Sequence, residues 1–214
     1  MPSAESTSSL GPSGISALFW DLAGTLVPSD PVTGRSGILP GCDEFLPELA
    51  RNHRLFVTTG DTTAGARGLL ADHGILRHFE AIYGDLFAAV GKPYGSILRQ
   101  VGADAEHSLA IGDRLRADVP NDTADVVTIL INQNGDVLNA GMIAFLIGRL
   151  RRHAAAFPAA FDAMLAAAVP DPDGVSAQDG VGVVQAARLT DGFALRLWRY
   201  RHPALSEDRR VIVI

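Results

Sequence analysis

The chain has 214 residues, 47% of them hydrophobic and 20% charged, a composition typical of a soluble globular protein with one full core. A net charge of −6 and a pI near 5.4 argue against broad nucleic-acid binding, and no run reaches the ~18 apolar residues of a membrane span. The single cysteine, Cys42, excludes an internal disulfide and a zinc cluster. Residues 1–14 are rich in Ser, Pro and Gly and lack a signal-peptide pattern, so we expect a disordered leader and a cytoplasmic protein.

The first two thirds of the chain alternate strand-like and helix-like segments. Five short segments are predicted as strands: 15–20, 55–58, 81–83, 108–111 and 126–131. Helices are predicted between and after them, over 42–52, 62–74, 93–101 and 115–124. This alternation indicates an α/β fold, a Rossmann-like, doubly wound parallel sheet in three layers.

The last third of the sequence has a different character. An amphipathic helix with a basic end is predicted over 141–153, followed by an Ala-rich stretch over 154–169 and a linker over 171–180. Strand-like runs over 183–189, 193–200 and 209–214 follow, with a hairpin signal at 190–192. We therefore predict a core domain over 15–153 and a small α+β appendage with antiparallel strands over 154–214.

One acidic residue follows the first predicted strand directly. Asp21 is succeeded by the turn residues Gly24 and Thr25, and ligands of open α/β sheets bind beyond the carboxyl ends of the strands. A carboxylate in this place is a candidate nucleophile or metal ligand. By itself the pattern equally fits a turn-former or a helix cap.

Further polar residues stand at the other strand ends. Thr58 ends the second strand, where its hydroxyl can donate to an anion, although a strand-end Thr before a helix cap looks the same. Lys92 precedes a proline at a predicted helix start, where it is either a solvated charge or a counter-charge for carboxylate and phosphoryl groups. Asp113 and Asp118 follow the fourth strand, where they can cap a helix or hold a hard cation.

Together, the order Asp-x-x-Gly-Thr, strand-end Thr, Lys-Pro and Gly-Asp-x-x-x-x-Asp resembles the haloacid dehalogenase-like hydrolase superfamily over residues 15–132. By this resemblance Asp21 is the nucleophile that forms an aspartyl-phosphate. Thr58, or Thr59 if the register shifts by one, binds phosphoryl oxygens, and Lys92 offsets charge. A cation, Lys, Thr and backbone N–H groups are what phosphoryl transfer requires.

The resemblance also implies a Mg²⁺ site and a substrate site. Asp21, Asp113 and the Ala23 carbonyl are the expected ligands, and Asp118 orients Lys92 or the metal's water. Substrate contacts are expected from Gly24, Thr25, Thr59, Gly60 and Arg35. Arg35 lies on a Pro- and Gly-rich flap over 27–40, although an exposed arginine there is commonly just solvated.

Position 23 departs from the phosphatase pattern. The family's phosphatases carry a second Asp two residues after the nucleophile as general acid and base, and here Ala23 takes its place. A methyl group cannot transfer a proton, so roughly 10²–10⁴-fold of rate assistance is missing. The protein is then a slow or specialised phosphatase-like hydrolase, a phosphonatase- or dehalogenase-like hydrolase, or a catalytically silent binding or regulatory protein.

Architecture weighs among these alternatives. Phosphonatases use a lysine on a cap domain, but the stretches after the first and second strands are too short for a helical cap, and residues 27–40 contain no lysine. We therefore expect a capless or minimally capped hydrolase. Its partner is a phosphorylated small molecule or macromolecule rather than a nucleic acid or a membrane, and the site is open or closed by a homo-oligomer.

Overall fold

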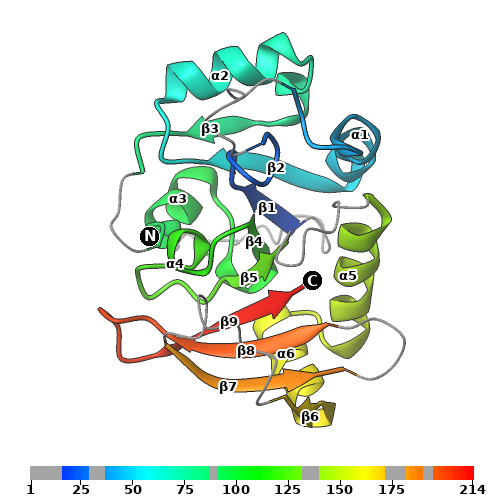
Figure 1. The fold of residues 1–214 in the computed structure, drawn as a ribbon, viewed down its shortest axis with the longest axis vertical. Coiled ribbons are helices and arrows are strands. Elements are labelled where there is room, and N and C mark those ends of the chain that lie inside the picture. Colours follow the sequence, from blue (N-terminus) through cyan, green and yellow to red (C-terminus); the bar gives the residue numbers. More distant parts are fainter. Residues whose placement is uncertain (1–15, 29–36, 87–90, 132–139, 172–181, 190–194) are drawn as a thin grey trace, which may run out of the picture.

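The computed structural model describes residues 16–28, 37–86, 91–131, 140–171, 182–189 and 195–214. Within these ranges one nine-stranded sheet runs through the molecule in the order β3-β2-β1-β4-β5-β9-β8-β7-β6 (Figure 1). The strands are β1 (Ser16–Trp20), β2 (His53–Thr58), β3 (Ala81–Tyr83), β4 (Ser108–Gly112), β5 (Val127–Leu130), β6 (Val169–Pro170), β7 (Val183–Arg188), β8 (Arg196–Arg201) and β9 (Asp208–Val213). The pairs from β3 to β9 are all parallel, so the mixed α/β fold with a largely parallel sheet is confirmed.

Helices cover both faces of this sheet. They are α1 (Cys42–Asn52), α2 (Thr63–Asp72), α3 (Tyr94–Val101), α4 (Leu115–Asp118), α5 (Ala140–His153) and α6 (Phe157–Ala167), with short 3₁₀ turns η1 (Leu76–His78) and η2 (Ala105–His107). Figure 1 shows α1 and α5 on one side of the strands and α3 and α4 on the other. The predicted leader, the 171–180 linker apart from Asp171, and the 190–192 hairpin turn lie outside the described residues.

The alternation of side chains along β1 explains the three layers. Leu18 and Trp20 pack in a cluster with residues of α1, α2, α5 and α6, whereas Ala17 and Phe19 pack in a second cluster with residues of α3. All five residues of β1 are buried, as expected for a strand covered on both faces. The strand that delivers Asp21 is therefore the centre of the core.

The helix predicted over 115–124 is wrong in length. The observed α4 ends at Asp118, and the chain then passes through Val119 in an extended conformation to Pro120. A residue before proline is disfavoured in the helical region, and this explains the early end. The extended segment forms a parallel bridge between Pro120 and Lys92, so the shortened helix serves the site described below.

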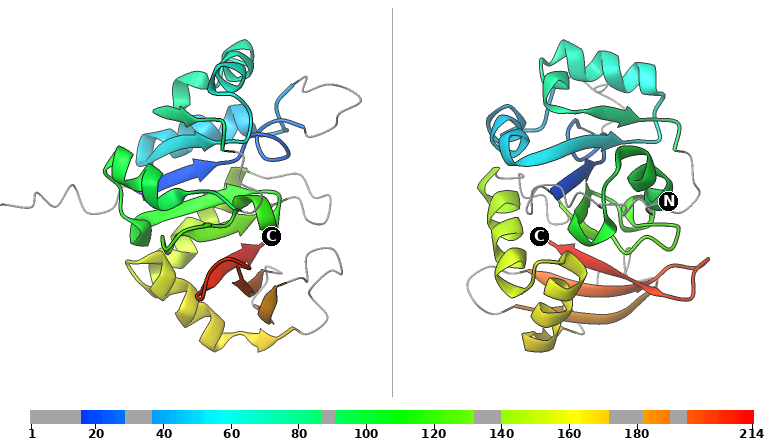
Figure 2. Two further views of the ribbon diagram at one scale, coloured as in Figure 1. Left: turned by 90° about the vertical axis from the view of Figure 1, so that its left-hand side faces the viewer. Right: turned by 180° about the vertical axis from the view of Figure 1, so that it is seen from behind.

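The C-terminal strands extend the core sheet. As predicted, β7 and β8 are antiparallel, and so are β8 and β9. However, β9 lies between β8 and β5 and pairs with β5 in parallel, Thr128 opposite Val211 (Figure 2). Arg210 on β9 forms ion pairs with Asp162 of α6 and with Asp125, which ties this part to the core. The division of the chain at residue 153 stays a prediction.

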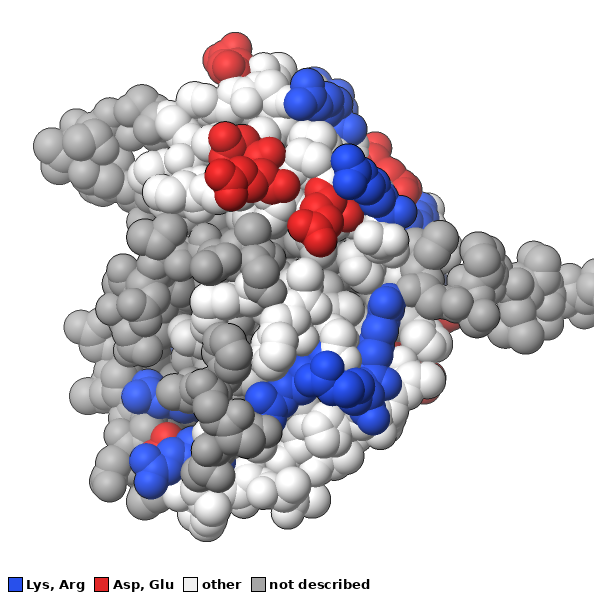
Figure 3. Space-filling view, turned by 90° about the vertical axis from the view of Figure 1, so that its right-hand side faces the viewer, with Lys and Arg blue, Asp and Glu red and all other residues white. Residues whose placement is uncertain are grey.

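No helix within the described ranges is long and apolar enough to cross a membrane. Figure 3 looks onto the side of the molecule with α1 and α5, where acidic side chains in the upper part lie beside basic ones and a further basic group lies below them. The last turn of α5 carries Arg151, Arg152 and His153, and both arginines are exposed. Cations at a helix C-terminus interact favourably with the helix dipole, which fits the basic end predicted for this helix.

Candidate active site at the carboxyl edge of the sheet

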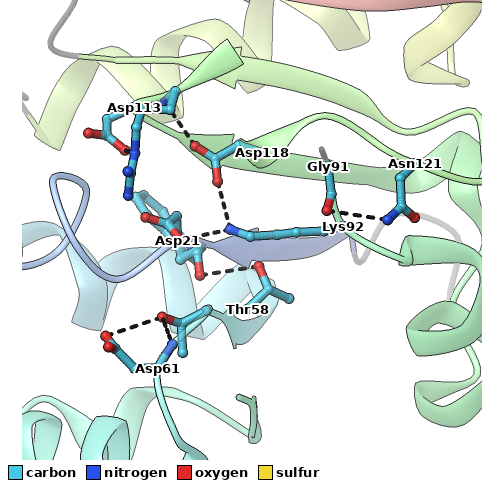
Figure 4. Close-up of polar contacts among 11 residues, drawn as sticks. Asp21, Thr58, Asp61, Gly91, Lys92, Asp113, Asp118 and Asn121 are labelled. Carbon is cyan, nitrogen blue, oxygen red and sulfur yellow. Dashed lines mark hydrogen bonds and ion pairs between the residues drawn. The ribbon is translucent and has the colours of Figure 1, made fainter. Parts of the chain in front are cut away.

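Side chains from several separate segments meet where the parallel strands end. Asp21 follows β1, Thr58 ends β2, and Asp113 follows β4, which lie side by side in the sheet. Lys92, just before α3, and Asp118, at the end of α4, reach the same point (Figure 4). The predicted convergence of these residues at one edge is therefore observed.

Asp21 is fixed by both its backbone and its side chain. Its N–H donates to the carbonyl of Ile111 on β4 at 2.8 Å, and its side-chain Oδ1 accepts from Lys92 Nζ at 2.7 Å. The other oxygen, Oδ2, is buried and has no hydrogen-bond partner among the described residues. A buried carboxylate oxygen without a partner is costly. It marks the point where a cation or a substrate atom fits.

Lys92 lies between two carboxylates. Its Nζ donates to Asp21 Oδ1 and to Asp118 Oδ1, both at 2.7 Å, and its exposed fraction is 3%. It is the only lysine in the chain, beside seventeen arginines. A compact ammonium with three donors can hold two carboxylates and still turn one N–H to a third oxygen, so we interpret it as a counter-charge rather than a solvated lysine.

Asp118 holds the lysine from the other side. Its Oδ2 accepts from the backbone N–H of Arg114 at 2.9 Å, so both of its oxygens have partners. The carboxylate packs directly over Gly112, where a β-carbon would lie 2.1 Å from Asp118 Oδ2. The predicted contact of Asp118 with Lys92 is therefore observed, and its other predicted role, toward the metal's water, stays a prediction.

Asp113 completes a group of three acids. A carboxylate oxygen from each of Asp21, Asp113 and Asp118 lies within 4.8 Å of the other two. Asp113 packs against Gly24, where a β-carbon would lie 2.1 Å from its Oδ2, and Gly24 has a φ of +85° that favours glycine. Closely placed carboxylate oxygens are the donors that Mg²⁺ prefers, and the donor set here fits such an ion.

The charges of the site favour a divalent cation as well. Three carboxylates share one buried ammonium, and the exposed Arg114 forms an ion pair with Asp113 at 3.6 Å, so the buried part of the site carries an excess of negative charge. Burial raises the pKa of Asp21 to about 6, and the negative charge of Asp118 adds to the rise while Lys92 opposes it. Burial also raises the pKa of Asp113. A bound cation would stabilise the ionised form of both groups.

The lysine itself stays charged. Burial alone would lower the pKa of Lys92, but Tyr94, Asp118 and Asp21 outweigh it, and the pKa lies above its ordinary value. A positive charge at this point persists over the whole physiological pH range. It can therefore neutralise an anion that binds beside Asp21.

Two threonines stand at the end of β2: Thr58 is the last residue of the strand, and Thr59 follows it. Thr58 is fully buried, and its hydroxyl is 3.5 Å from the carbonyl of Trp20, beside Asp21 (Figure 4). The Oγ1 of Thr59 instead accepts a hydrogen bond from the backbone N–H of Asp61 at 3.2 Å. Thr58 is thus the better placed of the two predicted candidates, and Gly60 lies in the turn between Thr59 and Asp61.

Backbone hydrogen bonds within the turn after Asp21 hold its conformation. The N–H of Gly24 donates to the Val27 carbonyl at 2.7 Å, and that of Thr25 lies 3.4 Å from the Leu22 carbonyl. The hydroxyl of Thr25 is buried without a hydrogen-bond partner among the described residues. Ala23 is 9% exposed. Arg35 lies outside the described residues.

Sequence reasoning missed the segment that positions Lys92. The backbone N–H of Lys92 donates to the carbonyl of Val119 at 2.9 Å. The N–H of Asn121 in turn donates to the carbonyl of Lys92 at 3.0 Å. Asp122 then accepts the N–H of Gly95 at 2.7 Å, at the start of α3. The available signal was Pro120, which disfavours a helical conformation at Val119 and so ends α4 at Asp118.

Comparison with known proteins supports the core fold. Residues 32–120 match the family model described as haloacid dehalogenase-like hydrolase. This range begins after Asp21, so the place of Asp21 in the site rests on the geometry described above. No functionally curated protein matches the sequence.

Several solved structures match part of the chain at low sequence identity. The HAD-hydrolase YfnB from Bacillus subtilis, solved with bound magnesium, has a TM-score of 0.50 at 12% identity, over 63% of this chain and 99% of that one. A haloacid dehalogenase-like hydrolase from Xanthomonas campestris has a TM-score of 0.49 at 13% identity over 66% and 100%. One from Streptococcus pneumoniae has 0.44 at 19% over 55% and 84%. The chain is thus similar over residues 32–120 to haloacid dehalogenase-like hydrolases, and it shares the fold of YfnB.

Proposed function

We propose that this protein is a Mg²⁺-dependent phosphatase-like hydrolase with Asp21 as the nucleophile. The observation that carries the proposal is the buried pair of Asp21 and the chain's only lysine at the carboxyl edge of the sheet. Lys92 holds Oδ1 of the carboxylate and leaves Oδ2 without a partner among the described residues, so Oδ2 is the oxygen available for attack.

The surrounding residues have the properties that phosphoryl transfer needs. Asp21, Asp113 and Asp118 lie close enough for their carboxylates to surround a cation, with the Ala23 carbonyl as a proposed further ligand. Bound Mg²⁺ would supply positive charge that neutralises the phosphoryl oxygens. The third N–H of Lys92 and the hydroxyl of Thr58 are proposed to donate to two of these oxygens and to orient phosphorus toward Oδ2.

Ala23 restricts the substrate class. A leaving group that needs a proton as it departs finds a methyl group at this position. We therefore expect activity on phosphoryl donors whose leaving group is stable as an anion, such as acyl or aryl phosphates, and poor activity on alkyl phosphates.

The test is phosphate release from acetyl phosphate, p-nitrophenyl phosphate and glycerol phosphate, with Mg²⁺ or with EDTA. We expect release from the first two only, dependent on Mg²⁺ and abolished by Asp21→Asn. The Ala23→Asp variant should add activity on glycerol phosphate. Equal activity of native protein and Asp21→Asn would refute the assignment of the nucleophile.

The same methyl group also favours a second candidate, a protein that binds a phosphorylated ligand without reaction. Calorimetric titration with inorganic phosphate and Mg²⁺, in parallel with the activity panel, distinguishes the two. Binding without phosphoryl transfer from any donor would favour the second candidate.

A further inference from the structure

Cleavage of an aspartyl-phosphate needs a proton acceptor that its formation does not need. When Oδ2 of Asp21 attacks an acyl phosphate, a new P–O bond forms and the bond to the leaving carboxylate breaks, and no proton moves. When water then attacks phosphorus, the P–O bond to Asp21 breaks and the water must lose a proton to a base. The two steps therefore make different demands on the site.

The carboxylates around Asp21 are poorly placed to act as this base. Position 23 carries a methyl group. Asp118 is 1% exposed, and its two oxygens accept from Lys92 Nζ at 2.7 Å and from the Arg114 N–H at 2.9 Å. A carboxylate oxygen of Asp113 lies within 4.8 Å of oxygens of Asp21 and Asp118, and as a proposed ligand of the cation it would be occupied when the cation is bound.

Among the residues that the structure describes, Asp61 is a further carboxylate near Asp21. Figure 4 shows Asp61 on the side of Asp21 away from Asp113. Its Oδ2 is 3.5 Å from the Thr59 hydroxyl, which in turn accepts the backbone N–H of Asp61 at 3.2 Å. These contacts direct Asp61 toward its own loop, and the experiment below tests it separately.

Burial limits the access of water to the bond between phosphorus and Asp21. Asp21 is 6% exposed and Lys92 is 3% exposed, so water has little access from the protein side of the carboxylate. The Lys92 ammonium lies 2.7 Å from Asp21 Oδ1, and by the proposed geometry it also contacts the transferred group. The ammonium assists both steps alike by neutralising charge, so it does not replace the base that water needs. Exclusion of water favours persistence of the acyl phosphate.

We infer that the aspartyl-phosphate on Asp21 accumulates, so that the protein takes a phosphoryl group from acyl phosphates and holds it rather than releasing it at once. The inference rests on the proposed function, since it requires Asp21 as the nucleophile. It adds a statement about the two steps of that function: phosphorylation of Asp21 is faster than the hydrolysis of the aspartyl-phosphate that follows.

The experiment is intact-protein mass spectrometry after mixing with acetyl phosphate and Mg²⁺ and quenching in acid at successive times. We expect native protein to gain the mass of one phosphoryl group in most molecules. Asp21→Asn should gain none, and hydroxylamine, which cleaves acyl phosphates, should remove the added mass from native protein. After removal of the donor, the adduct of native protein should decay about 10²–10⁴-fold more slowly than that of Ala23→Asp.

A matched variant separates the missing base from a change of shape. Ala23→Asn has nearly the volume of Ala23→Asp but no proton acceptor, and its adduct should decay as slowly as that of native protein. Fast decay in Ala23→Asn would overturn the inference. Far-UV circular dichroism checks the fold of each variant. If Ala23→Asp does not fold, the fraction of native protein found as adduct during steady-state phosphate release tests the inference: a large fraction supports it, and a negligible fraction overturns it.

The remaining outcomes separate this inference from the proposed function. Phosphate release by native protein without an adduct would overturn the inference and leave Asp21-dependent hydrolysis standing. If Asp61→Asn then accumulated the adduct, Asp61 would be the base. No adduct and no release in native protein and in Ala23→Asp would overturn both proposals.

Discussion

The stability of the metal-free protein should depend on the protonation of Asp21. Burial raises the pKa of this carboxyl from 3.8 to about 6 in the folded state. Between these values the folded chain binds a proton that the unfolded chain has released, so the free energy of unfolding falls as the pH rises from about 4 to about 6. The Asp21→Asn variant has no proton to lose here and should lack this part of the decline.

The size of the effect follows from the two pKa values. One pKa unit corresponds to about 1.4 kcal/mol, so the interval from 3.8 to about 6 gives about 3 kcal/mol. Asp21 is 6% exposed, and solvent screening therefore reduces this figure little. Between pH 4 and pH 7, the free energy of unfolding of native protein should therefore fall by about 3 kcal/mol more than that of Asp21→Asn.

The assay is urea unfolding followed by circular dichroism at pH 4, 5, 6 and 7 in EDTA. Asp72→Asn, on the exposed face of α2, is the control and should follow native protein. Added Mg²⁺ should flatten the decline of native protein at pH 6–7, because it binds the ionised carboxylate. Parallel curves for native protein and Asp21→Asn would refute the reasoning, since Asp21 would then titrate alike in both states.

Three further substitutions test the supports of the site. Lys92→Met leaves two buried carboxylates without their cation and should cost about 3–5 kcal/mol at pH 7 in urea unfolding, partly restored by Mg²⁺. Gly24→Ala places a methyl group 2.1 Å from Asp113 Oδ2 at a φ of +85° and should weaken Mg²⁺ binding in calorimetry about tenfold or more. The control Gly68→Ala, which meets nothing within 4 Å on α2, should leave that binding unchanged and stabilise slightly. Asp122→Ala removes the acceptor of an N–H at the start of α3 and should lower the melting temperature by the equivalent of about 1 kcal/mol.

The parallel core was predictable because its strands are continuous apolar runs. β3 and α1 have the predicted bounds, and β1, β2, β4 and β5 differ from prediction by one or two residues. Segments buried on both faces leave little choice of secondary structure, and the polar residue after each run then marks the carboxyl edge. This is why Asp21 and Asp113 could be assigned to one site from the sequence alone.

The partners of the C-terminal strands could not be predicted in the same way. The run ending at Ile214 indicated a strand, but no local pattern says that β9 pairs with β5. The backbone hydrogen bonds that fix Lys92 could not be predicted either, because their partners, Val119 and Asn121, come from a loop later in the chain. Two signals were nevertheless present: Pro120 ends α4, and a lone lysine among so many arginines is unusual for a surface charge.

The place of β9 has a consequence for how the chain folds. Thr128 pairs with Val211, so β5 gains its second neighbour only when a segment far along the chain arrives. Until then β5 presents an open edge with apolar residues on both faces, a surface prone to pair with other chains. Contacts so distant in sequence slow folding. Removal of residues 196–214 should therefore yield a chain that aggregates during refolding, even though every predicted site residue precedes the cut.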